Sequence, residues 1–409
     1  MRFFVAKVLI CFVVATIYGY GGPGRIASGQ PATVASASAD KAAFPGEVRL
    51  SLPSAIYATP GLECNIYFDN VVLVLNRHNY AFNVTCDKGL QFAERWAFTP
   101  TADECGKYPI AIEVRNEANE LVARGETTIH VVRPSTVKAE PTTLLITGAS
   151  FVEYSIYPQH ILDLSKADGA PPLRLLGSRG AGNMPAIGEL RHEGYSGWTA
   201  EAFATMAGPL SRTGYHDRPG TGSPFVYESA DGTKVLDFAR YCEEFNDGKP
   251  PDFVTIDLGG NDIFSATDAT IDATIDRMFV HYDAVIDSIR KAGLQTRIGV
   301  LASTPPSASQ DGFRNYVGTG KQTQWQFHRN IHRLVERKIE HYDNRTSEGI
   351  YLVPTSVNLD TEAHFPTWSS PRNARSDESV VRVNNGTHPS PAGYRQIGDS
   401  VFSWLMNNL

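Results

Sequence analysis

The stretch Leu144-Leu145-Ile146-Thr147-Gly148-Ala149-Ser150 decides how this chain folds. Its apolar residues are consecutive instead of alternating with polar ones, which is typical of a strand buried on both faces of a parallel sheet. Further largely apolar runs follow at Leu173–Leu176, Phe253–Leu258, Ile298–Leu301 and Ile350–Val353. We expect each of these runs to be another strand of the same sheet.

Helical periodicity lies between these runs. Apolar residues recur at steps of three and four from Ile271 to Ile289 and again from Tyr394 to Leu405, at the end of the chain. Alternating strands and helices predict right-handed crossovers and a doubly wound parallel sheet, an α/β fold. A charged segment, Gln322 to His341, predicts a solvent-facing amphipathic helix.

Short polar segments lie where such a sheet would place its functional site. In doubly wound sheets the site lies outside the carboxyl ends of the strands. The segments are Gly148-Ala149-Ser150, His192 to Thr199, Gly259-Gly260-Asn261-Asp262 and Asn385-Gly386-Thr387-His388-Pro389. Each is expected at a strand end or a helix entrance, so the fold would gather them at one edge.

The residue types in these segments suit acyl transfer. A serine hydroxyl is a weak nucleophile that needs an adjacent base, and an imidazole has a suitable pKa. Ser150 and His388 fit these two roles. The oxyanion of a tetrahedral intermediate needs fixed donors, for which the candidates are the backbone N–H groups of Ser150 and Gly197 and the side chain of Asn261.

The four segments, taken together and in this order, resemble the sequence blocks of the SGNH (GDSL-like) hydrolases. The resemblance covers residues 143–409 and implies a three-layer α/β/α fold and hydrolysis of esters on lipids, sugars or small acyl compounds. It implies Ser150 as nucleophile, Gly197 and Asn261 as oxyanion donors and His388 as base. A β-sandwich ahead of the catalytic domain is similar to some bacterial secreted members.

Two positions depart from the family pattern. Ala149 stands where the first block usually has Asp, and Asn385 stands where an Asp usually precedes the histidine by three residues. An asparagine can accept a hydrogen bond from the imidazole N–H and orient the ring, but it supplies no charge for the imidazolium. We predict that Asn385 orients His388, and a backbone carbonyl is the alternative.

Trp198 and His192 are candidates for contact with substrate. Trp198 lies beside Gly197 and could stack on a sugar ring, or it could pack against the sheet edge instead. His192 could reach substrate, or it could be a solvated loop residue.

The first third of the chain predicts other units. Arg2 and Lys7 with a short apolar run, Val8 to Ile17, predict a signal peptide at 1–22, with a short membrane anchor as the alternative. Residues 23–43, rich in Gly, Ala, Ser and Pro, predict a flexible leader. Period-two alternation within 44–134 predicts a small antiparallel, Ig-like β-sandwich. Residues 135–142 are the expected linker to a hydrolase domain at 143–409.

The net charge and the cysteine content limit which classes of ligand and partner the chain can have. The formal net charge is -7 and no Lys/Arg run stands out, which argues against a nucleic-acid partner. Four cysteines follow the signal peptide, at Cys64, Cys86, Cys105 and Cys242. They allow one disulfide among the first three in an oxidising compartment, or buried free thiols. No CxxC pair or His-rich spacing points to zinc, so we expect neither metal nor cofactor.

These observations lead to a functional hypothesis. We expect a secreted or periplasmic serine esterase without stable membrane insertion, which removes acyl groups from extracellular carbohydrate. A lipase or general carboxylesterase is one alternative with the same chemistry. A non-catalytic glycan-binding protein that keeps the fold is the alternative from another class, motivated by Ala149 and Asn385.

Overall fold

The computed structural model describes residues 48–133, 140–167, 169–208, 222–314 and 322–409. The described residues belong to one compact unit, Ala42–Leu409. The predicted signal peptide at 1–22 and leader at 23–43 lie outside the described residues, as does most of the predicted linker at 135–142.

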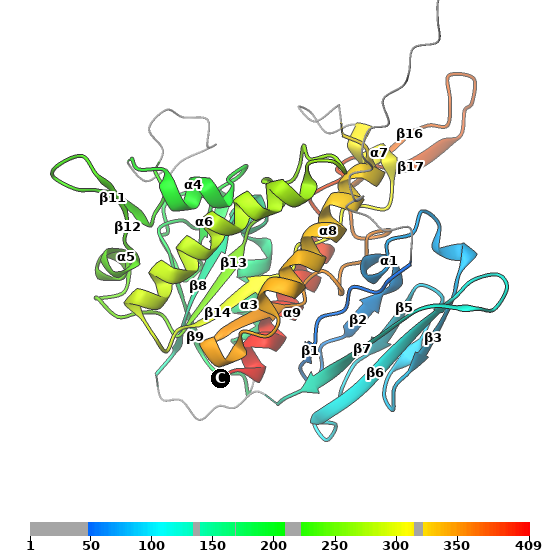
Figure 1. Cartoon of the computed structure of the whole chain (residues 1–409), viewed down its shortest axis with the longest axis horizontal. Coiled ribbons are helices and arrows are strands. Elements are labelled where there is room, and N and C mark those ends of the chain that lie inside the picture. Colours follow the sequence, from blue (N-terminus) through cyan, green and yellow to red (C-terminus); the bar gives the residue numbers. More distant parts are fainter. Residues whose placement is uncertain (1–47, 134–139, 168, 209–221, 315–321) are drawn as a thin grey trace, which may run out of the picture. The chain divides into compact units, whose positions relative to one another are not determined.

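The main sheet is parallel and has six strands (Figure 1). Its order is β10-β8-β13-β14-β15, and β9 also pairs with β8. The strands are β8 (Thr142–Gly148), β9 (Leu173–Leu176), β10 (Glu193–Gly194), β13 (Phe253–Asp257), β14 (Arg297–Leu301) and β15 (Ile350–Val353). All of the predicted apolar runs are thus strands of one sheet.

Helices cover both faces of this sheet. Leu145 belongs to a hydrophobic cluster with α4 (Ala200–Thr205), α5 (Phe238–Phe245), α6 (Ile271–Ala292) and α8 (Gln324–Tyr342). Leu144 and Ile146 belong to the opposite cluster, with α3 (Ile156–Leu164) and α9 (Pro391–Asn407). Consecutive residues of β8 therefore pack against different helix layers, which explains the unbroken apolar run. The predicted three-layer α/β/α fold is confirmed.

The N-terminal part of the described chain forms two smaller sheets. One is four-stranded, with order β1-β7-β6-β3, and the other is three-stranded, with order β2-β5-β4. The strands are β1 (Ala55–Ala58), β2 (Cys64–Tyr67), β3 (Ala81–Thr85), β4 (Leu90–Gln91), β5 (Arg95–Phe98), β6 (Gly106–Arg115) and β7 (Leu121–Val131). Residues of both sheets share one hydrophobic cluster. β1 runs parallel to β7, so the larger sheet is mixed, unlike the predicted antiparallel arrangement.

Short elements complete the described chain. They are α1 (Phe68–Val71), η1 (Arg77–Asn79), α2 (Ser150–Glu153), η2 (Ala181–Asn183), β11 (Val226–Glu228), β12 (Lys234–Leu236), α7 (Gln310–Arg314), η3 (Thr346–Glu348), β16 (Thr367–Pro371) and β17 (Ser379–Val383). β11 pairs with β12 and β16 with β17, both antiparallel. β17 leads directly into the segment that carries His388.

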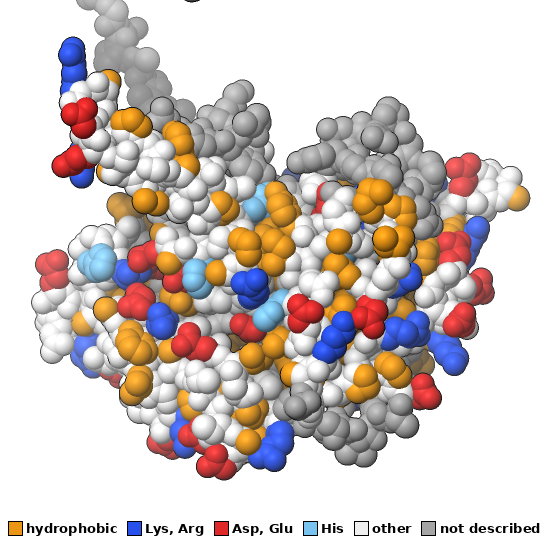
Figure 2. Space-filling model, turned by 180° about the vertical axis from the view of Figure 1, so that it is seen from behind, with side chains coloured by type: hydrophobic (Ala, Val, Ile, Leu, Met, Phe, Trp, Pro, Cys, Tyr) orange, Lys and Arg blue, Asp and Glu red, His pale blue; other side chains and the backbone are white. Residues whose placement is uncertain are grey.

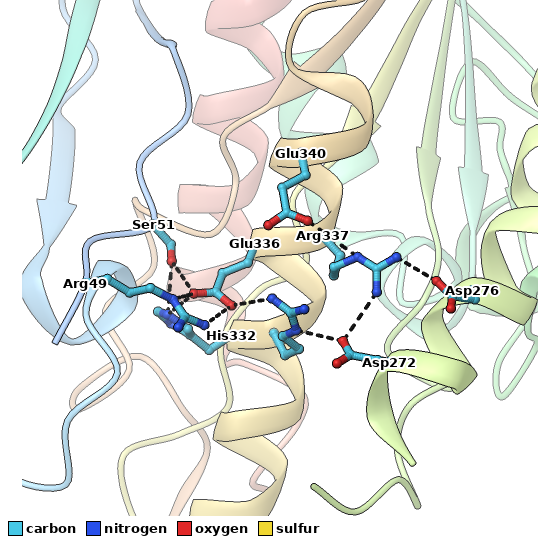
Figure 3. Close-up of polar contacts among 9 residues, drawn as sticks. Arg49, Ser51, Asp272, Asp276, His332, Glu336, Arg337 and Glu340 are labelled. Atoms are coloured by element: carbon cyan, nitrogen blue, oxygen red, sulfur yellow. Dashed lines mark hydrogen bonds and ion pairs between the residues drawn. The ribbon is translucent and has the colours of Figure 1, made fainter. Parts of the chain in front are cut away.

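Polar contacts join the N-terminal segment to helix α8 (Figure 3). The Arg49 guanidinium donates to both carboxylate oxygens of Glu336, one of these bonds measuring 2.6 Å. The Ser51 hydroxyl lies 3.0 Å from Nε2 of His332. On its other side, α8 reaches α6 through Arg337, which donates to Asp276 at 2.6 Å. Helix α8 is therefore tied on two sides, and it is not the solvent-facing helix that its charges predict.

Several sequence expectations concern charge, thiols and membranes. Figure 2 shows acidic and basic side chains interspersed over the face that it presents. Cys64, Cys86, Cys105 and Cys242 are free thiols. Within the described ranges, no helix combines the length and apolarity that a membrane span requires. The same ranges hold no cluster of three or more His, Cys, Asp or Glu side chains suited to a metal ion.

Candidate active site

Ser150 follows the carboxyl end of strand β8, as the first residue of α2. The chain turns there against β13: the Ala149 amide donates to the Asp257 carbonyl at 3.2 Å. A Cβ at Gly148 would lie 2.5 Å from that same carbonyl oxygen, so only glycine permits this approach. The turn places the Ser150 side chain at the sheet edge, where the fold predicts a site.

His388 meets Ser150 across this edge. Its Nε2 lies 2.8 Å from the Ser150 Oγ, within hydrogen-bond distance. The ring packs beside Phe151 and Tyr154 of the first turn after the serine, with centroids 5.5 and 5.0 Å away. Desolvation by these surroundings lowers the pKa of His388 to about 4. The imidazole is therefore neutral near pH 7 and can accept a proton from the serine.

The other ring nitrogen of His388 faces Thr387, which sequence reasoning missed. The Thr387 Oγ1 lies 3.2 Å from His388 Nδ1 and 3.3 Å from Asn385 Oδ1. The hydroxyl can accept from Nδ1–H and donate to the amide oxygen at once. This arrangement favours the tautomer with its proton on Nδ1, which leaves Nε2 free to accept from Ser150.

Asn385 itself holds the backbone of this loop. Its Oδ1 accepts from the backbone N–H of Thr387 at 3.0 Å and of His388 at 2.9 Å. Asparagine commonly makes such bonds to residues two or three positions further along the chain. They occupy the oxygen that we expected to accept from the imidazole N–H. Asn385 reaches the imidazole only through the Thr387 hydroxyl, and the direct contact that we predicted is absent from its hydrogen bonds.

Asn261 follows β13 and faces the same cavity as Ser150 and His388. Its Nδ2 donates to the Trp198 carbonyl at 3.0 Å. An amide nitrogen carries two N–H groups, so a second donor remains for a ligand. Nearby, the Asp262 carboxylate accepts from the Ala200 amide at 3.1 Å, which fixes the start of α4 beside the same turn.

Gly197 lies in the loop that Asn261 contacts. Its φ is 76°, in the left-handed region that favours glycine. Gly197 is not among the residues lining the cavity, which are Ala149, Ser150, Phe151, Asp257, Leu258, Gly260, Asn261, Phe264, Ser303, Thr304, Phe327, Ile331, Thr387 and His388. The role of Gly197 as an oxyanion donor stays a prediction.

The arrangement can perform nucleophilic substitution at a carbonyl, and comparison with known proteins agrees with this chemistry. The sequence profile of the GDSL-like Lipase/Acylhydrolase family matches residues 179–396, more than half of the chain. The chain belongs to this family. The match includes Asn261 and His388, whereas Ser150 precedes it. No curated protein matches the chain.

Solved structures give weaker likenesses to this GDSL-like acylhydrolase. One is a family 3 carbohydrate esterase from Talaromyces cellulolyticus, at 16% identity and a TM-score of 0.39, covering 66% of this chain and 99% of that one. Another is a family 3 carbohydrate esterase from Clostridium thermocellum, at 15% identity and a TM-score of 0.35, covering 66% and 98%. A carbohydrate acetylesterase family member from Sinorhizobium meliloti has 12% identity and a TM-score of 0.36, covering 66% and 100%. At these scores the likenesses carry no argument about substrate.

Trp198 of the acylhydrolase is a core residue, so the structure favours packing, the alternative stated for this residue, over contact with substrate. Only 2% of its surface is exposed. The indole stacks on Tyr195 at a centroid distance of 4.5 Å and meets the edge of Phe203 at 5.2 Å. Because the indole is buried against these rings, it has no exposed face on which a sugar could stack.

His192 is also buried and cannot contact substrate as we predicted. Its Nε2 lies 2.8 Å from the Ser155 hydroxyl, and its Nδ1 accepts from the Gly194 amide at 3.1 Å. Burial lowers the pKa of His192 to about 3. The imidazole is a neutral structural link between the segment after α2 and strand β10.

Glu153 is a second residue that sequence reasoning missed. It lies three positions after Ser150 on α2 and is buried. Its carboxylate accepts from the Ser196 amide, next to Gly197, and lies 3.6 Å from the buried Arg179 guanidinium. Glu153 thereby ties the predicted oxyanion loop to the helix that carries the serine. A carboxylate three residues after a candidate nucleophile, on the same short helix, was the available signal.

Proposed function

We propose that this acylhydrolase is a serine esterase with Ser150 as nucleophile and His388 as general base. The observation that carries the proposal is the 2.8 Å separation between the serine Oγ and the imidazole Nε2. A nucleophile and base within hydrogen-bond reach, with the base oriented by a third group, is the arrangement that activates a serine hydroxyl.

The reaction follows from these positions. The Ser150 Oγ attacks the ester carbonyl carbon while His388 Nε2 takes the hydroxyl proton, and the carbonyl oxygen becomes an oxyanion. Collapse of this intermediate expels the alcohol, which receives the proton from His388, and leaves an acyl group on Ser150. Water then attacks the acyl-enzyme with His388 again as base, releasing the carboxylic acid and the free serine.

Asn261 supports charge stabilisation in both halves of this reaction. Its second Nδ2–H is the donor that we assign to the oxyanion, together with the backbone amides of Ser150 and Gly197. Glu153 acts on the same loop by accepting from the Ser196 amide. We propose that this bond holds the Gly197 amide in place, since it fixes the preceding peptide.

The substrate that we propose is an acylated carbohydrate outside the cytoplasm. The predicted signal peptide and the additional β region motivate this choice. A carboxylesterase for longer acyl chains is the second candidate, and one observation favours it. The cavity beside Ser150 has an apolar wall made of Leu258, Phe264, Phe327 and Ile331. A series of p-nitrophenyl esters from acetate to octanoate, run beside acetylated polysaccharides, separates the two candidates.

Ser150→Ala tests the esterase proposal. We expect the wild type to release p-nitrophenol from the acetate and to react with a fluorophosphonate. Loss of the nucleophile lowers kcat by about 10⁴-fold or more and abolishes labelling. Ser229→Ala, at an exposed serine, is the matched control and keeps both properties. Labelling of Ser150→Ala at the wild-type rate contradicts the assignment of the nucleophile.

A further inference from the structure

Lys338 is a fully buried lysine on helix α8. Its exposed fraction is 0%, which is rare for an ammonium group. The Nζ donates to the carbonyl oxygens of Leu258 and Leu301, both at 2.8 Å, and to the Ser303 hydroxyl at 3.1 Å. These bonds use all the N–H groups of the ammonium. A buried charge is costly, so the fold surrounds this one with fixed acceptors.

The acceptors lie directly beneath the candidate active site. Leu258 follows β13 and Leu301 ends β14, so Lys338 joins the carboxyl ends of two adjacent strands. Leu258 and Ser303 both line the cavity beside Ser150. Asn261, the proposed oxyanion donor, comes three residues after Leu258. The ammonium therefore holds the two strand ends from which the floor of the cavity is built.

Acidic groups surround the ammonium and keep it charged. Burial lowers the pKa of Lys338 to about 8, while the negative charges of Asp257 and Asp262 act against this decrease. Burial raises the pKa of both carboxyls to about 6. The ring of Tyr282 on α6 lies 5.4 Å from the Nζ. Near pH 7 a positive lysine thus faces two negative aspartates.

We infer that Lys338 is a positioning residue whose charged ammonium fixes the ends of β13 and β14 and, through them, Asn261 and Ser303. This inference rests on the proposed esterase function. A neutral amine can still donate to the two carbonyls while the Ser303 hydroxyl donates to its lone pair. Loss of the charge nevertheless weakens both bonds to the strand ends, because charge-assisted hydrogen bonds are about twice as strong as neutral ones. Misplacement of a catalytic group by about 1 Å costs about 10²-fold in rate.

Lys338→Met in the full chain is the first test. We expect kcat on p-nitrophenyl acetate to fall by about 10- to 100-fold, with KM changed by less than about threefold, because the ester still fits the cavity. Lys291→Met, at an exposed lysine of α6, is the matched control and keeps the wild-type kcat. A folded Lys338→Met protein with kcat within about twofold of wild type overturns the inference.

The pH profile supplies a second readout that a merely structural lysine would not change. With a pKa of about 4, His388 is almost entirely neutral above about pH 5. The loss of kcat near pH 8 that we expect in the wild type therefore reports another group. Asp257→Asn removes a charge that raises the pKa of Lys338, and we expect this loss to move to lower pH. If the loss of kcat at alkaline pH occurs at the same pH in Asp257→Asn as in the wild type, the inference is overturned. This test holds even where Lys338→Met does not fold.

The two proposals fail in different ways. A wild-type chain that neither hydrolyses the ester nor reacts with the fluorophosphonate refutes the esterase proposal itself, and with it the role assigned to Lys338. The other case is an active wild type in which Lys338→Met keeps the wild-type kcat and Asp257→Asn keeps the wild-type loss of kcat at alkaline pH. This result refutes only the role of Lys338. Thermal unfolding of each variant checks that the compared proteins are folded.

Discussion

The pH dependence of His388 gives the sharpest prediction about the mechanism. A general base acts only in its neutral form, so activity falls as the imidazole is protonated. Desolvation lowers the pKa of His388 to about 4, and the segment behind the ring offers the uncharged Asn385. We therefore expect kcat/KM for a simple ester to persist well below the pH at which an ordinary histidine is protonated.

The size of this effect is set by the fraction of neutral imidazole. With the pKa of His388 at about 4, about nine-tenths of the ring is neutral at pH 5. An imidazole with the unperturbed pKa of about 6.5 would be only about 3% neutral at that pH. At pH 5 the protein should consequently retain about thirty times the relative activity of one with an unperturbed histidine.

Asn385→Asp tests whether a negative charge at residue 385 would raise the pKa of His388. The contacts from Asn385 to Thr387 and on to His388 Nδ1 measure 3.3 and 3.2 Å. A new negative charge about 6 Å from the ring, at an effective dielectric constant of about 20, attracts the imidazolium by about 2.8 kcal/mol. The acid limb of kcat/KM should therefore move upward by about two pH units.

The assay is a pH-stat profile of kcat/KM on one acetyl ester, with far-ultraviolet circular dichroism at each pH to verify folding. Asn384→Asp is the matched control, because it makes the same change at the exposed neighbouring residue. A wild-type limb near pH 6.5 would refute the desolvation argument. If Asn385→Asp shifts the acid limb no further than Asn384→Asp does, residue 385 does not influence the pKa of the imidazole.

Three further outcomes are expected. Asn261→Ala should lower kcat by about 10²–10³-fold, and a change of less than about twofold would make this residue structural. Glu153→Gln should lower kcat more than it raises KM, because a neutral amide holds the Ser196 N–H less firmly; equal activity in a folded variant would contradict this. A chain starting at Pro141 should keep its kcat on small soluble esters. Its unfolding temperature should fall by about 5–10 °C, because helix α8 loses its contact with Arg49. A folded but inactive truncation would place part of the site before Pro141.

The sheet was predictable because burial leaves a plain mark on the sequence. Leu144 and Leu145 pack into clusters on opposite faces of the sheet, and such a strand shows an unbroken apolar run instead of alternation. Once the strands were placed, their parallel order brought Ser150 and Asn261 to one edge. The division into a β-sandwich domain and a hydrolase domain stays a prediction.

The errors concern side chains whose surroundings come from distant parts of the chain. Trp198 and His192 were candidates for contact with substrate, with packing at the sheet edge as the alternative for Trp198 and a solvated loop as the alternative for His192. Tyr195 and Phe203 enclose the indole, and Ser155 takes the imidazole. The charges on α8 suggested a solvated helix, yet Glu336 pairs with Arg49, 287 positions away, as well as with residues of its own helix. Such pairings leave no periodic signal.

The side chains that hold the site share a physical feature that explains why sequence reasoning missed Glu153 and Lys338 and did not foresee the backbone contacts of Asn385. Glu153 binds the amide of Ser196, Lys338 binds the carbonyls after β13 and β14, and Asn385 binds the amides of Thr387 and His388. Each is a polar side chain that binds backbone groups, in addition to the side-chain contacts that it makes with Arg179, Ser303 or Thr387. Backbone acceptors and donors are present at every residue, so no residue type marks the partner. For the same reason, substitution of the residues whose backbone is bound leaves these bonds intact, so the direct test of each bond is a change to Glu153, Lys338 or Asn385 itself.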